Sequence, residues 1–230
     1  MARAGDEIVN PRTGQRMVFL ETGEETNGEL VRIDTFNPPT GVPEPEHVHP
    51  FQESGAEVLS GSLRFHMNGR ERSVKAGESI TIPANTPHNF WNHGEEVAHA
   101  VQWFRPALKT DRFFETFFGL AQDGKLNEKG LPSFFQLAVM VPRFGDEIRL
   151  TSPPWAVQKA LFGALAPVGR LLGYRAEYPY PYGGSDASPG REDGRPSMVS
   201  GARGGVVAAS VLAIFFAFFL LRWCSRSRRR

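Results

Sequence analysis

Residues 46–54, EHVHPFQES, place two histidines one residue apart and a carboxylate four residues after the second. Side chains at positions i and i+2 of a β-strand point to the same face, so His47 and His49 present two imidazoles side by side. A transition-metal ion can bridge two such rings at about 2.0–2.1 Å from each nitrogen. One His-x-His pair is a weak signal by itself, and the rest of the chain has to supply the remaining ligands.

A second stretch supplies a third histidine. Residues 77–92, GESITIPANTPHNFWN, carry His88. Taken together, the two stretches resemble the two conserved motifs of the cupin superfamily, the first over residues 41–61 and the second over residues 77–92. The resemblance covers roughly residues 25–106. It implies a small antiparallel β-barrel of the cupin or jelly-roll type.

The residue pattern of the same region also predicts β-strands, independently of the resemblance. Residues 17–106 form short segments with alternating apolar positions, separated by turn residues and without a helical pattern between them. Asn68 and Gly69 are the dipeptide preferred in the type I′ turn of a β-hairpin. These features predict a mainly β domain, built as an antiparallel sandwich or barrel.

The resemblance to cupins also implies a set of metal ligands. The family typically uses two histidines and a glutamate from the first motif and one histidine from the second, which correspond here to His47, His49 and His88. The usual glutamate position holds Ser54, and its neighbour Glu53 could serve only if the strand carries a bulge, because a shift of one residue turns the side chain to the opposite face. We expect the carboxylate to be lost, and keep Glu53 as the optional fourth ligand.

Three neutral imidazoles suit a divalent transition metal, and the candidates are Zn, Fe, Ni, Mn and Cu. A fourth, anionic ligand would help to hold a redox metal, so its loss makes oxygenase chemistry less favourable. The alternative is a metal-free barrel that keeps its histidines for packing and hydrogen bonds.

A helical extension is predicted at residues 111–173. Apolar residues recur at helical spacing after Asp111, which is a suitable N-cap, and Gly124 is a suitable stop. Two further helical segments carry prolines, and we expect Pro142 to interrupt the first of them. The region also resembles a helical extension found in one bacterial group of single-domain cupins.

The C-terminal part predicts a membrane anchor. Residues 174–203 are rich in Pro, Gly and Ser and predict a flexible linker. Residues 204–221, GGVVAASVLAIFFAFFLL, contain no charge, and eighteen helical residues rise about 27 Å, close to the thickness of a bilayer core. Residues 222–230 form a basic tail with five arginines. We expect a single-pass transmembrane helix that tethers a cytoplasmic barrel, although the basic tail by itself favours the opposite orientation of the barrel.

The composition gives no indication of a nucleic-acid partner and excludes cysteine-based cross-links and metal clusters within the chain. Lys and Arg number 26 against 25 Asp and Glu, so no overall positive field indicates a nucleic-acid partner. The single cysteine, Cys224, excludes an intrachain disulfide and a thiolate metal cluster.

These observations predict a membrane-tethered cupin that binds one divalent metal and a small molecule in the barrel. The first alternative is a metal-dependent enzyme, of dioxygenase or isomerase type, acting on a small and hydrophobic substrate. The second is a metal-free ligand-sensing or scaffold module, since cupins commonly form homodimers through edge strands. The sequence leaves open which of these the chain is, and whether it catalyses a reaction at all.

Overall fold

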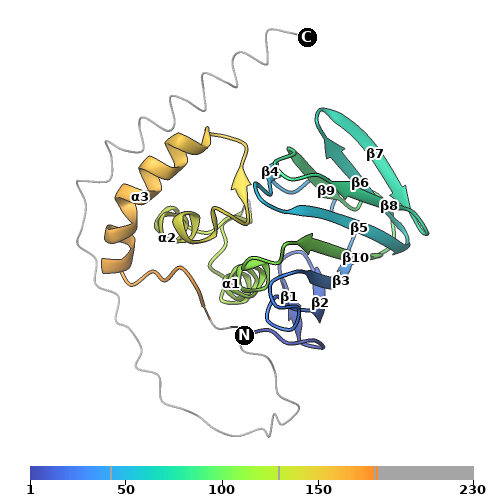
Figure 1. The fold of residues 1–230 in the computed structure, drawn as a ribbon, viewed down its shortest axis with the longest axis horizontal. Coiled ribbons are helices and arrows are strands. Elements are labelled where there is room, and N and C mark those ends of the chain that lie inside the picture. The colour runs from blue at the N-terminus through green and yellow to red at the C-terminus, as the bar shows by residue number, and fades with distance from the viewer. Residues whose placement is uncertain (42, 129, 179, 181–230) are drawn as a thin grey trace, which may run out of the picture. The chain divides into compact units, whose positions relative to one another are not determined.

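The computed structural model describes residues 1–41, 43–128, 130–178 and 180, which form two antiparallel sheets and three helices (Figure 1). The six-stranded sheet holds, in spatial order, β1 (Glu7–Val9), β2 (Arg16–Glu21), β3 (Val31–Asn37), β10 (Ala98–Arg105), β5 (Glu53–Ser60) and β8 (Ser79–Ile82). The five-stranded sheet holds β11 (Arg149–Leu150), β4 (His47–Val48), β9 (His88–Trp91), β6 (Ser62–Met67) and β7 (Arg70–Lys75). The helices are α1 (Thr110–Gln122), α2 (Phe134–Phe144) and α3 (Trp155–Leu171).

Strand alternation builds the core between the two sheets. In β3 and β10 every second side chain is buried, as expected of strands with one face turned to a core. One apolar cluster joins buried residues of both sheets: Ala56, Val58, Leu63, Phe65, Val74, Ile80, Ile82, Ala98 and Ala100. The predicted mainly β, jelly-roll type fold with added helices is therefore confirmed.

The prediction that the strands close into a barrel is wrong. Each sheet ends in edge strands, β1 and β8 in one and β11 and β7 in the other, so neither hydrogen-bonded ladder closes on itself. The domain is a sandwich, because the two sheets meet through side chains rather than through a continuous ladder of backbone hydrogen bonds.

The predicted hairpin is confirmed. β6 and β7 pair with Met67 opposite Arg70, which leaves Asn68 and Gly69 as a two-residue loop. Their φ angles are 50° and 77°, and positive φ at both central residues is the requirement of a type I′ turn.

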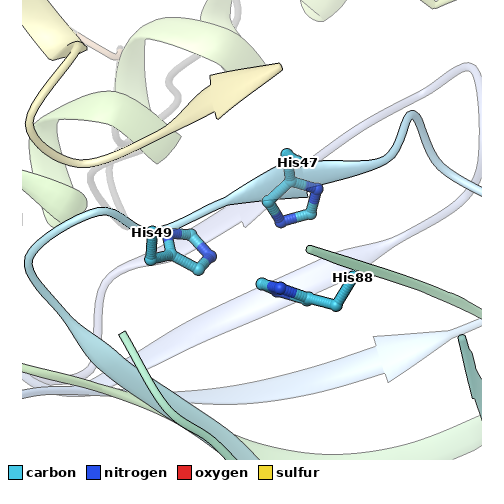
Figure 2. A group of neighbouring side chains, drawn as sticks. All are labelled: His47, His49 and His88. Carbon is cyan, nitrogen blue, oxygen red and sulfur yellow. The ribbon is translucent and has the colours of Figure 1, made fainter. Parts of the chain in front are cut away.

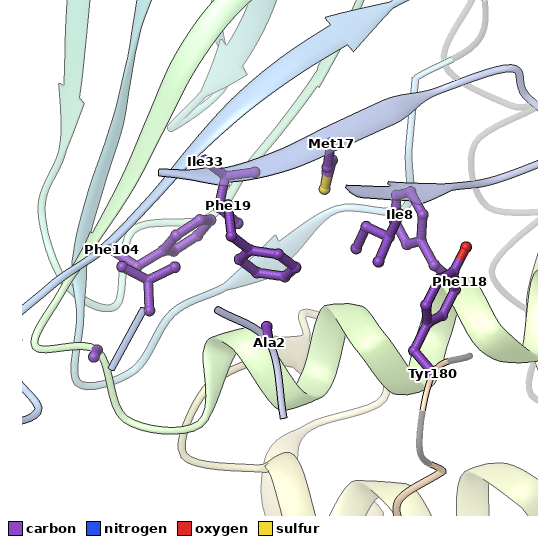
Figure 3. Packing of buried hydrophobic residues seen from close by; sticks show 10 residues of the cluster. Ala2, Ile8, Met17, Phe19, Ile33, Phe104, Phe118 and Tyr180 are labelled. Carbon is purple, nitrogen blue, oxygen red and sulfur yellow. The ribbon is translucent and has the colours of Figure 1, made fainter. Parts of the chain in front are cut away.

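A second cluster attaches helix α1 to the six-stranded sheet. Phe118 of α1 is buried with Ile8, Met17 and Phe19 of the first two strands (Figure 3). The N-terminal segment is part of this packing, because β1 pairs with β2 upstream of the first strand expected from the sequence. The helix thereby covers one end of the sandwich, close to Phe104 of β10.

The second helix differs from the sequence-based expectation. α2 continues through Pro142 to Phe144, where an interruption was expected. Pro142 lies in the last turn, so it removes one hydrogen bond near an end where the helix is about to stop. At the other end the Ser133 side chain accepts a hydrogen bond from the Gln136 N–H, which caps the helix.

The C-terminal predictions fall mostly outside the described residues. Nearly all of the linker, the apolar segment at 204–221 and the basic tail belong to this part of the chain. Within the described ranges, no helix combines the length and the apolar character needed to span a bilayer.

Replacement of Gly55 by alanine tests the packing of β5 between β10 and β8. A Cβ atom at Gly55 would overlap the indole of Trp103 on β10 and the carbonyl oxygen of Ile80 on β8. We expect Gly55→Ala to lower the free energy of unfolding by about 1–3 kcal/mol, because the neighbouring strands must shift. Urea unfolding measures the change.

Gly163→Ala is the matched control. Gly163 lies within α3, and apart from its chain neighbours and the backbone of its own helix no atom lies within 4 Å of the position of an added Cβ. Alanine favours a helix over glycine, so this variant should be as stable as the original chain or more stable. Equal stability of both variants would contradict the predicted strand packing.

Candidate metal centre

Two neighbouring strands bring the three predicted histidines together. β4 and β9 run antiparallel, with His47 directly opposite His88, and His49 follows β4 on the same face. The ring centroids lie 4.5 Å apart for His47 and His88, 5.1 Å for His47 and His49, and 5.3 Å for His49 and His88. One nitrogen from each ring lies within 4.8 Å of the others, and Figure 2 shows the three rings converging. The His-x-His pair and His88 therefore form the possible metal site that the sequence predicts.

Backbone carbonyl groups hold each ring in a tautomer that leaves Nε2 free to bind a metal. The acceptors of the three Nδ1 atoms are the carbonyl oxygens of Pro45 for His47 (2.9 Å), Glu147 for His49 (2.6 Å) and Thr86 for His88 (2.8 Å). A carbonyl oxygen only accepts hydrogen bonds, so each Nδ1 carries the proton and each Nε2 keeps a free lone pair. This is the usual outer support of a metal-binding histidine.

Burial keeps the three imidazoles neutral. Each of the three side chains is less than a tenth exposed. Desolvation lowers the pKa of all three below 6.5. With repulsion from the neighbouring rings, which also lowers the pKa of His47, the pKa of His49 falls to about 4. At neutral pH the three rings are uncharged and ready to bind a cation, because the neutral imidazole is the ligand form.

The strand β5 presents serine, not glutamate, to this site. It pairs with β10 in unbroken register from Glu53 to Val58, so there is no bulge at this position. Glu53 is consequently exposed, and it is not part of the histidine cluster. Ser54 is buried, and its Oγ has no hydrogen-bond partner in the described structure.

A cavity of about 500 Å³ opens in front of the histidines. Its wall includes the three histidines and Ser54 from the sheets, and apolar residues from two helices. The helical residues that line it include Phe113, Phe114 and Phe117 of α1 and Leu137, Met140 and Val141 of α2. The sequence predicted both helices, but it carried no signal that they would cover the site. A mainly apolar wall with fewer polar groups suits a small organic molecule.

Glu147 is a further cavity residue that sequence reasoning missed. It lies between α2 and β11, and its side chain is 3% exposed. Burial raises its pKa. Its Oε1 accepts a hydrogen bond from the Lys109 N–H at 3.1 Å, whereas its Oε2 is buried and has no hydrogen-bond partner among the described residues. The site thus combines three free Nε2 lone pairs with unpaired buried oxygens, a donor set that fits a divalent cation.

Substitution of a histidine tests the site directly. His47→Ala and His88→Ala should each abolish metal retention, because two imidazoles remain where three converge. Glu53→Ala should retain the metal of the original chain, because Glu53 is exposed on the other face of β5. Elemental mass spectrometry of the purified proteins measures the metal content. A loss of metal in Glu53→Ala would show that the strand rearranges when it binds metal.

Acidification should destabilise the metal-free protein between about pH 6.5 and about pH 4. The pKa of His49 is lowered from 6.5 to about 4 by folding, so the unfolded chain binds more protons in this window. The free energy of unfolding therefore falls as the pH falls, by about 3 kcal/mol for this residue. Urea unfolding at neutral and at mildly acidic pH tests this. His49→Gln should show a smaller loss, and an equal loss would contradict the assignment.

Comparisons with known proteins agree with this picture. The family described as Cupin domain matches residues 35–104. The chain is 31% identical over 177 residues to the probable oxidoreductase virH of Hypocrea virens, a match that covers 71% of this chain and 75% of that protein. It is 27% identical over 155 residues to an oxidoreductase of Arthrobotrys oligospora, covering 61% of this chain and 60% of that protein.

Among solved structures, an RmlC-like cupin from Shewanella frigidimarina is similar to this chain. The identity is 19%, the TM-score is 0.40, and the match covers 48% of this chain and 93% of the other. The family match lies on the region that carries both histidine stretches, and the relative from Hypocrea virens extends the similarity across most of the chain. This chain belongs to the cupin superfamily.

Proposed function

We propose that this cupin is a metal-dependent oxidoreductase that acts on a small apolar molecule bound in the cavity. The convergence of three Nε2 lone pairs carries this proposal. Two relatives described as oxidoreductases support the reaction class. A divalent transition metal bound there would supply Lewis acidity or one-electron chemistry, depending on the element.

The protein groups around the metal position have separate tasks. The carbonyl oxygens behind the rings keep the three Nε2 atoms aimed at one point. The aromatic side chains of α1 contact the apolar body of the substrate and exclude water from the site. Phe104 packs edge-on against His49 and also contacts Phe114, so the apolar wall extends to one of the metal ligands.

A binding or sensing module is the second candidate. Ser54 favours it, because a neutral hydroxyl stands where an anionic ligand would help to hold a redox metal. In this case the cavity would capture its ligand and release it unchanged.

Attachment to a membrane and dimer formation are further proposals that rest on the sequence. The uncharged segment at residues 204–221 supports a single-pass anchor. We place the cupin domain on the cytoplasmic side, against the orientation that the basic tail by itself favours. A homodimer through edge strands remains a proposal from the resemblance to cupins.

Metal content and turnover of the full chain distinguish the two functions. The protein is first analysed by elemental mass spectrometry, then incubated with a hydrophobic fraction of a cell extract and followed by liquid chromatography and mass spectrometry. An oxidoreductase should change the mass of a compound by two hydrogens or by oxygen atoms, and His88→Ala should not. His93→Ala is the control, because His93 is exposed in a loop outside the cluster.

Retention of a compound without any change in its mass would favour the binding module. Absence of metal after reconstitution, with no change from His88→Ala, would exclude the metal-dependent function. Identification of the metal as zinc would exclude one-electron chemistry, because zinc has a single accessible oxidation state in proteins.

A further inference from the structure

We propose that Glu147, from the helical extension, supplies the carboxylate of the metal centre that β5 lacks at Ser54. The inference rests on the proposed metal site and adds a residue to it from a different part of the chain. Glu147 acts as a positioning residue, whose charge holds the cation on its three neutral ligands.

A short strand pairing holds Glu147 beside the site. β11 pairs with β4, with Leu150 opposite His47, so the segment just before β11 runs along the histidine strand. The Thr151 N–H donates to the Glu46 carbonyl oxygen at 3.2 Å and continues this pairing. The Glu147 carbonyl oxygen accepts the hydrogen bond of His49 Nδ1 at 2.6 Å. One residue therefore both orients a ligand and lines the same cavity.

The Glu147 side chain has one oxygen that the described structure leaves unused. Its Oε1 accepts from the Lys109 N–H at the start of α1. Its Oε2 is buried without a hydrogen-bond partner, on a residue that lines the cavity with the three histidines. An unpaired buried polar atom costs about 1–3 kcal/mol, more if it is charged. Buried polar atoms in native proteins normally have a hydrogen-bond or metal partner, so we expect Oε2 to bind a partner in the cavity.

A divalent cation on the three histidines would pair with this carboxyl group, and each would offset the desolvation cost of the other. Three neutral imidazoles leave its charge uncompensated, and much of the cavity wall is apolar. A buried carboxylate and a buried cation each carry a large desolvation cost alone and offset one another when paired. The carboxyl group lies outside the close cluster of ring nitrogens. The cation and the carboxyl group would therefore pair through a water molecule or through an atom of a bound small molecule.

Glu44 is the competing carboxylate, and its position is less suitable. Its Oε1 lies 3.9 Å from Nδ1 of His47, the nitrogen that already faces the Pro45 carbonyl oxygen. Its Oε1 is buried without a hydrogen-bond partner among the described residues, as Oε2 of Glu147 is, but its side chain as a whole is 37% exposed, whereas Glu147 is 3% exposed. Glu44 therefore serves as the matched comparison for Glu147.

A Zn²⁺ titration of the full chain tests the proposal. Each variant is stripped with a chelator, and its Zn²⁺ affinity is measured at neutral pH by competition with a chromophoric chelator. Glu147→Gln should bind Zn²⁺ about 10- to 100-fold more weakly, the range found for groups that support metal ligands. Glu44→Gln should stay within a few-fold of the original chain, and His88→Ala should lose binding. The metal-free Glu147→Gln protein should melt at the original temperature, because the glutamine oxygen still accepts from Lys109.

The outcomes separate this inference from the proposed function. Unchanged Zn²⁺ affinity of Glu147→Gln, with binding lost in His88→Ala, would overturn the role of Glu147 and leave the histidine site standing. A weakened Glu44→Gln in place of Glu147→Gln would also overturn it. Unchanged binding by His88→Ala would overturn the metal site and the inference together.

A second variant covers the case in which Glu147→Gln is less stable. This double variant combines Glu147→Gln with Ser54→Glu, which places a carboxylate on the inward position of β5. Recovery of Zn²⁺ affinity would show that the lost charge was the cause. An affinity that stays low would show that Glu147 acts through packing, and would overturn the proposal.

Discussion

The antiparallel pairing of β4 with β9 is the contact on which the candidate site depends. It sets His47 opposite His88, two residues that are far apart in the chain, and His49 joins them by strand alternation. Both strands are short, and each carries little free energy of its own. Their alignment is stable because β9 also pairs with β6, and because β4 pairs with β11 on its other side. The position of the three rings is therefore a property of the whole five-stranded sheet.

Backbone groups, rather than charged side chains, prepare the three rings. A carbonyl oxygen selects the Nδ1-protonated tautomer without adding charge to the site. Burial lowers the pKa of each ring, so no proton has to leave when a cation arrives at neutral pH. The three rings are uncharged until a metal binds, and this is why the location of a carboxylate matters for what the rings can hold.

The helical extension covers the histidine site, and its helices form part of the cavity wall. α1 brings an aromatic face, α2 adds aliphatic side chains, and the segment after α2 returns to the histidine strand as β11. The extension thus belongs to the site as much as the two motifs do. It also offers Glu147 on the cavity wall, while the sheet position of the expected glutamate holds Ser54.

The sequence by itself determined the mainly β character, the Asn68-Gly69 hairpin and the three-histidine cluster. These features depend on local rules: the two-residue period of a strand, the positive φ of a type I′ turn, and the spacing of two motifs. The open edges of the sheets, the path of α2 through Pro142 and the cavity under α1 were decided by tertiary structure. Glu147 and His49 are 98 residues apart, and only the pairing of β11 with β4 brings them into contact, because no local pattern encodes a hydrogen bond between distant segments.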